Sequence, residues 1–301
     1  MEEGRPSTTA MMVARIRAAH LLWADAPKIF QDPLALGLSG AGSPDALQAT
    51  LRAIQAGEAR RVPPEFAQAL SRYNNPGGVL VRQRYAEDEL ATAVERGVGQ
   101  YVILGAGLDS FAYRRPDLAT ILRVFEVDHP ATQQWKRARL RELSVNLPSN
   151  LTFIPLDFEQ HTLAAGLTAG GHRPELPTFF SWLGVTQYLT EEAVFTTLRY
   201  VASSAPGSEI VFQYFLPESL FDDENRRLLA LWKAQRALVR EPVLSQFEPT
   251  KLAARVQALG FTQVWDVGPE EVDARYLAGR TDGLCTPPHA HLMKARVGSV
   301  A

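Results

Sequence analysis

Two glycines and three acids, spaced over the middle of the chain, have the types and the order needed to bind a nucleotide. The stretch ILGAGLDS places Gly105 and Gly107 directly after an apolar run, and Asp109 follows them. Glycine lets a backbone turn sharply and lets a ligand approach it closely. Asp128 ends the run FEVD about 20 residues further on, the distance at which an acid at the tip of a second strand reaches ribose hydroxyls.

Three choices within this set stay open at the level of the residues. Glu126 alternates with Asp128 along the same run, so either carboxylate could be the ribose ligand. Asp157 ends the next apolar run and could accept a hydrogen bond from an exocyclic amine such as that of adenine. Asp109 could bind a ligand or cap the short helix that follows it.

The residues of the turn separate two classes of cofactor. A dinucleotide turn favours a third glycine or alanine, and this chain has Ser110 there, after the acid Asp109. An acid repels a pyrophosphate but suits the ammonium group of S-adenosylmethionine, so the turn favours the methyl donor. The chain has neither a Gly-Lys-Ser/Thr phosphate loop nor a Tyr-x-x-x-Lys motif. An NAD(P)-dependent oxidoreductase is the more distant alternative, and a non-catalytic cofactor-binding module is also open.

The elements that must position these residues follow from the pattern of apolar runs. From Tyr101 onward, short apolar runs alternate with helical stretches, which predicts an α/β fold with a mostly parallel sheet covered on both faces. The predicted strands contain YVILG, ILRVFEVD, LTFIPLD, FFSWLGV, SEIVFQYF, FTQVWDV and HLMKARV. The glycines and acids above then lie at the carboxyl ends of strands, where ligands bind in such sheets.

Helices are predicted before and after this pattern. Residues 1–98 form a helical N-terminal region, with Met12, Ile16, Ala19 and Trp23 on one stripe and a chain break at NNPGG. Residues 99–301 form the core, with a helical insertion at about 217–246. We expect the N-terminal region and the insertion to cover the carboxyl edge of the sheet as a lid.

Composition narrows the class of protein. The 301 residues are 46% apolar and carry a net charge of −2, which gives no general attraction to nucleic acid or to anionic membranes. A single cysteine excludes an internal disulfide and a cysteine-built metal site, and we expect no metal. The start of the chain has no signal-peptide pattern and no apolar run is long enough to span a bilayer. We expect a cytoplasmic monomer or homodimer.

Several segments together resemble the leucine carboxyl methyltransferase-like family of class I S-adenosylmethionine-dependent methyltransferases, especially its bacterial branch of proposed O-methyltransferases. They are KIFQDPLA, VRQRY, ILGAGLDSFAYR, FEVDHPATQQWKRARL, FIPLDFE and FFSWLGVTQYLTEEAV. The resemblance implies a Rossmann-like fold with a seven-stranded sheet. It also implies that Arg82 binds the methionine carboxylate of the cofactor, with Arg84 as a rival for that role.

The resemblance assigns the remaining cofactor contacts as well. It implies that Gly105 and Gly107 form the cofactor turn, that Asp128 binds the ribose, and that Asp157 and Phe158 form the adenine site. Many members of the family carry a glutamate a few residues before the Tyr-Leu pair, and that glutamate contacts the cofactor. This chain has Leu183 at or near that position, which places it in a divergent branch.

Methyl transfer from a sulfonium is an in-line displacement, so the protein has mainly to align the two reactants and exclude water. A carboxylate acceptor needs no base, whereas a hydroxyl does. The candidates for catalytic groups are Tyr188, Tyr214 and His20. We predict an O-methyltransferase that acts on the carboxylate or hydroxyl of a small molecule, with natural products among the candidate acceptors. A protein carboxyl methyltransferase is the alternative.

Overall fold

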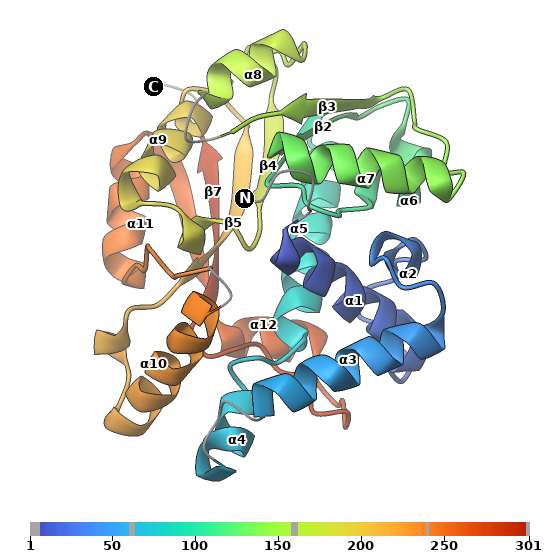
Figure 1. The fold of residues 1–301 in the computed structure, drawn as a ribbon. Coiled ribbons are helices and arrows are strands. Elements are labelled where there is room, and N and C mark those ends of the chain that lie inside the picture. Colours follow the sequence, from blue (N-terminus) through green and yellow to red (C-terminus); the bar gives the residue numbers. More distant parts are fainter. Residues whose placement is uncertain (1–6, 60–63, 158–161, 239–240, 299–301) are drawn as a thin grey trace.

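A single twisted sheet forms the centre of the protein in the computed structural model, which describes residues 7–59, 64–157, 162–238 and 241–298 (Figure 1). The strand order is β3-β2-β1-β4-β5-β7-β6. The strands are β1 (Gln100–Leu104), β2 (Arg123–Asp128), β3 (Leu151–Pro155), β4 (Thr178–Trp182), β5 (Glu209–Phe215), β6 (Phe261–Val267) and β7 (Ala290–Val297). All pairings are parallel except those of β7, which runs antiparallel to both of its neighbours. The predicted α/β class and mostly parallel sheet are confirmed.

Helices cover both faces of the sheet and its carboxyl edge. Those before β1 are α1 (Thr8–Trp23), α2 (Ala35–Leu38), α3 (Pro44–Ala59), α4 (Pro64–Ser71) and α5 (Gly77–Glu95). The helices within the strand pattern are α6 (Phe111–Arg114), α7 (Pro130–Glu142), α8 (Leu163–Ala169), α9 (Glu191–Ala202), α10 (Asp223–Leu238), α11 (Pro249–Ala258) and α12 (Pro269–Tyr276). No helix in the described ranges is both long and apolar enough to cross a membrane.

Alternation along the strands divides the core into two apolar layers. Val102 and Leu104 of β1 face one layer, which includes side chains of α8, α9 and α11. Tyr101 and Ile103 face the other, which includes side chains of α5, α6 and α12. Since α5 supplies much of this second layer, the region before β1 packs into the same core as the sheet. The boundary at residue 98 stays a prediction.

The buried face of α1 differs from the predicted stripe. Ala14, Arg17 and Ala18 are the buried positions in the middle of this helix, whereas Trp23 is 45% exposed. Small alanine side chains let α1 approach α2 closely, and Arg17 is buried because it has polar partners beneath it. A stripe of large apolar residues was therefore the wrong criterion for this helix.

The predicted chain break at NNPGG is also shorter than expected. Helix α5 begins within it at Gly77, whose N–H donates to Asn75 Oδ1 over 2.9 Å. A Cβ on Gly77 would come within 2.9 Å of the Cys285 backbone, and one on Gly78 would strike Pro287. These two glycines therefore serve close packing at the start of the helix rather than a flexible break.

A buried ion pair joins β2 to α7. Lys136 Nζ lies 2.5 Å from Glu126 Oε2, and both side chains are 1% exposed. Burial raises the pKa of Glu126 to about 7, although the Lys136 charge and hydrogen bond oppose this shift. Removing one partner of a buried pair leaves the other charge without compensation, which is costlier than losing both.

We expect Lys136→Met to lower the free energy of unfolding by about 3–5 kcal/mol at pH 8, because it leaves the buried Glu126 carboxylate without a positively charged partner. In this variant the folded-state pKa of Glu126 rises further, so the carboxyl holds a proton at pH 5 and the loss is smaller there. Urea unfolding at the two pH values measures both effects. The double variant Glu126→Gln with Lys136→Met is the control and should recover most of the loss; equal losses at both pH values would contradict the expectation.

Candidate active site

A cavity of about 400 Å³ opens at the carboxyl edge of the sheet, where the predicted nucleotide residues meet. Its walls come from the turn after β1, the ends of β2, β3 and β4, and one side each of α1 and α5. The sequence-predicted residues that line it are Arg82, Gly105, Gly107, Asp109, Asp128, Asp157, Leu183 and Tyr188. Phe158 lies outside the described residues.

The glycine turn has a backbone that other residues rarely adopt. Gly105 and Gly107 have φ values of +66° and +52°. A Cβ on Gly105 would collide with Val185 Cγ2, and one on Gly107 would lie 3.2 Å from the Cβ of Ala10 on α1. The turn therefore needs glycine both for its conformation and for the space around it.

Asp128 points back at this turn from the end of β2. Its Oδ2 accepts a hydrogen bond from the Gly107 N–H, and its Oδ1 accepts one from the His129 N–H over 2.6 Å. Burial raises the pKa of Asp128, and the two backbone hydrogen bonds oppose that shift. Glu126, the alternative ribose ligand, pairs with Lys136 and does not line the cavity.

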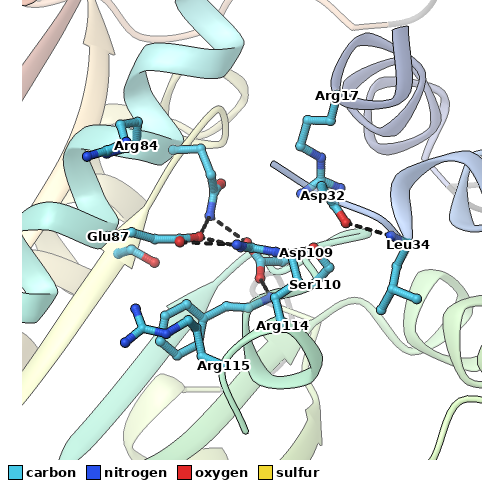
Figure 2. A network of polar contacts seen from close by, with 12 residues as sticks. Arg17, Asp32, Leu34, Arg84, Glu87, Asp109, Ser110, Arg114 and Arg115 are labelled. Carbon is cyan, nitrogen blue, oxygen red and sulfur yellow. Dashed lines mark hydrogen bonds and ion pairs between the residues drawn. The ribbon is translucent and has the colours of Figure 1, made fainter. Parts of the chain in front are cut away.

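A polar network ties the turn to α5 (Figure 2). Asp109 Oδ1 accepts from the Phe111 N–H over 2.7 Å, which caps α6, and Oδ2 accepts from Gln83 Nε2 over 2.9 Å. Gln83 also bonds to Glu87, which forms an ion pair with Arg114 at 2.5 Å. Asp109 thus accepts from the first N–H of the short helix and also lines the cavity, and its role as a ligand of the cofactor stays a prediction.

Ser110, which stands where a dinucleotide turn favours glycine, has a partner in the same network. Its Oγ accepts a hydrogen bond from Arg114 Nε over 2.8 Å, and the side chain is fully buried. The serine therefore helps to attach α6 beneath the turn, in a place where a glycine would leave the Arg114 Nε without this acceptor.

Two arginines enter the cavity from different helices. Arg82 of α5 lines it, and burial lowers the pKa of this guanidinium to about 10. Its rival Arg84 is exposed, bonds to Asp88 over 2.8 Å and does not line the cavity. Arg17 of α1, which sequence reasoning missed, also lines the cavity and donates to the Leu108 carbonyl over 2.5 Å. Its ion pair with Asp32 (3.4 Å) holds it there (Figure 2).

The three candidates for catalytic groups lie in different surroundings. Tyr188 lines the cavity, and its hydroxyl has no hydrogen-bond partner among the described residues. Tyr214 lies inside β5, where its hydroxyl donates to Asp266 over 2.5 Å. His20 Nε2 accepts from the Ile29 N–H over 3.0 Å, and burial lowers its pKa to about 4. Neither Tyr214 nor His20 lines the cavity, so only Tyr188 can meet a ligand there.

Comparison with known proteins decides the family. Residues 10–202 match the family model described as leucine carboxyl methyltransferase. The chain belongs to this family. It is 32% identical to YktD of Bacillus subtilis, a proposed S-adenosyl-L-methionine-dependent methyltransferase, over 98% of this chain and 99% of YktD. A Frankia alni protein of the same description is 36% identical over 67% of this chain and 66% of its own length.

The fold has a solved counterpart in a DUF574 family protein from Streptomyces avermitilis. That structure covers 94% of this chain and 96% of its own, with a TM-score of 0.54 at 14% identity. The family and its relatives make this protein an S-adenosylmethionine-dependent methyltransferase. The oxidoreductase and the non-catalytic module are therefore set aside.

The residues of the cavity fit this cofactor. The glycine turn leaves room for a ligand against the backbone, and Asp128 offers a carboxylate to ribose hydroxyls. Arg82 forms no ion pair with any carboxylate in the described part of the chain, so its charge is available to a methionine carboxylate. Among the described residues there is no cluster of three or more His, Cys, Asp or Glu that could hold a metal.

We expect Asp128→Ala to weaken binding of S-adenosylhomocysteine roughly 30-fold or more, the effect of losing hydrogen bonds to a charged group. Titration calorimetry at pH 7.5 measures the affinity directly. Asp117→Ala, which removes an exposed carboxylate paired only with Arg115, is the control and should bind like the unaltered protein. An unchanged affinity in the Asp128 variant would mean that the ribose lies elsewhere.

Proposed function

We propose that the protein is an O-methyltransferase for a small-molecule acceptor that carries a carboxylate or a hydroxyl group. Bound S-adenosylmethionine supplies an activated methyl on a positively charged sulfur, which is a good leaving group. The chain then has to orient the acceptor in line with that methyl and exclude water from the site. The observation that carries the proposal is the cover over the cavity.

Helix α1 and the segment after α10 together form this cover. Ala10 lies over Gly107, and the Ser7 N–H donates to Thr132 Oγ1 over 3.4 Å. Thr9 Oγ1 donates to Glu241 Oε2, and both residues line the cavity. A protein substrate would have to reach the cofactor past these two segments, which favours an acceptor small enough to enter beside them. The cover therefore favours a small acceptor.

Tyr188 is our candidate for orienting the acceptor. Its hydroxyl has no hydrogen-bond partner among the described residues, and the residue ends the short 3-10 helix Thr186–Tyr188 that follows β4. The Leu244 N–H donates to the Gln187 carbonyl over 2.7 Å, which attaches that segment beside Tyr188. A carboxylate acceptor needs no base, and for a hydroxyl acceptor Tyr188 would be the group placed to take part in the proton transfer.

Carboxyl methylation of a protein is the second candidate. The description of the family, leucine carboxyl methyltransferase, favours it. Leu183, at or near the place of the glutamate found in many family members, argues for a different acceptor from that of the enzymes that give the family its name. Location in the cytoplasm and assembly as a monomer or homodimer stay predictions.

We expect the protein to transfer labelled methyl from S-adenosylmethionine into the small-molecule fraction of a bacterial extract, because its cavity is covered. Filtration separates that fraction from protein, and mild alkali then releases the label as methanol from esters but not from ethers. Asp128→Ala, assayed in parallel, should lower incorporation. Label found mainly in protein would favour the second candidate instead.

A further inference from the structure

Arg82 is a half-buried cation of the cavity that lacks an acidic partner among the described residues. The other buried or half-buried cations in and beneath the site each have one, namely Arg17 with Asp32, Arg114 with Glu87 and Lys136 with Glu126. No described carboxylate pairs with Arg82, and the side chain on the cavity wall before Gly184 is the apolar Leu183. The wall of the cavity therefore carries one positive charge that no described carboxylate neutralises.

A neutral side chain holds this guanidinium instead. Gln213 of β5 is 4% exposed, and its Oε1 accepts a hydrogen bond from Arg82 Nη1 over 2.6 Å. Its backbone carbonyl accepts from Thr186 Oγ1 over 2.5 Å, which fixes the end of β5 against the segment that leads to Tyr188. The amide oxygen orients Arg82 as a carboxylate would, but it leaves the charge in place.

The backbone of Gly184 packs closely against the guanidinium. Gly184 has φ +72°, and a Cβ there would lie 2.7–2.9 Å from Nη1, Nη2 and Cζ of Arg82. The guanidinium thus contacts both Gly184 and Gln213, and Nη2 forms no hydrogen bond to the described residues. The remaining donors of Arg82, which lines the cavity, are free for a ligand.

We propose that Gln213 is a positioning residue that fixes Arg82 without neutralising it, so that the cavity selects a ligand carrying a carboxylate at this point. The ligand is the cofactor, whose methionine part bears that carboxylate, and the inference rests on the proposed cofactor role of this site. An acid at position 213 would supply an internal carboxylate and compete with the cofactor. An apolar residue there would leave the charge but lose its orientation.

The test compares two ligands that share the adenosine and the sulfur. S-adenosylhomocysteine carries the amino-acid part, with its carboxylate and its ammonium group, whereas 5′-methylthioadenosine lacks both of these groups. We expect Gln213→Glu to weaken binding of S-adenosylhomocysteine about tenfold or more in calorimetry, the scale of a lost charge-assisted hydrogen bond. Binding of 5′-methylthioadenosine should change by less than about twofold, because this ligand has no carboxylate for Arg82 to bind. A defect in folding would instead weaken the binding of both ligands.

Three further variants complete the experiment. Gln213→Met keeps the volume without the amide, and we expect a smaller loss, again confined to S-adenosylhomocysteine. Gln263→Glu makes the same change of charge on the exposed face of β6 and should alter neither affinity. Arg82→Ala is the reference and should reduce the preference for S-adenosylhomocysteine over 5′-methylthioadenosine by at least as much as Gln213→Glu does.

The outcomes separate the inference from the function on which it rests. If Arg82→Ala reduces the preference for S-adenosylhomocysteine but Gln213→Glu and Gln213→Met leave it unchanged, the role of Gln213 is overturned and that of Arg82 stands. If Arg82→Ala keeps the preference, the role of Arg82 fails and that of Gln213 fails with it. If the unaltered protein binds neither ligand, the proposed function itself is wrong.

Discussion

The hydrogen bonds between the turn after β1 and the end of β2 are the constraint on which the site depends. The N–H groups of Gly105 and Ala106 both donate to the Val127 carbonyl, over 2.8 and 3.1 Å, and the Gly107 N–H donates to Asp128. Three successive amides of the turn are thus held by two successive residues of the neighbouring strand. These hydrogen bonds fix the path of the turn relative to the end of β2, and with it the relative positions of Asp109 and Asp128 at the cavity.

The features that could be predicted from sequence are those that depend on residues adjacent in the chain. A run of apolar residues that is followed by glycine or by an acid, as in ILGAG and FEVD, predicts both a strand and the residue at which the strand ends. Because parallel strands end at the same edge, the placement of Asp128 and Asp157 beside the glycine turn followed without further information.

The features that were missed depend on partners far away in the chain. Arg17 was not singled out because its partners, Leu108 and Asp32, come from other elements. Gln213 lies in a strand with a mostly apolar sequence, and its relation to the site is visible only in its hydrogen bond with Arg82. The predicted stripe on α1 failed for a related reason, since the helix packs through small side chains that no hydrophobic pattern emphasises.

The antiparallel strand β7 has a consequence for the order in which the molecule can be built. It lies between β5 and β6 although it follows both of them in the chain, so the edge of β5 has no neighbour until β7 arrives (Figure 1). On a ribosome, the nascent chain would carry this strand edge unpaired until β7 had been synthesised, some 75 residues after the end of β5, and an unpaired edge can pair with other chains. The half of the sheet whose strand ends line the cavity, from β3 to β4, has all its strands much earlier.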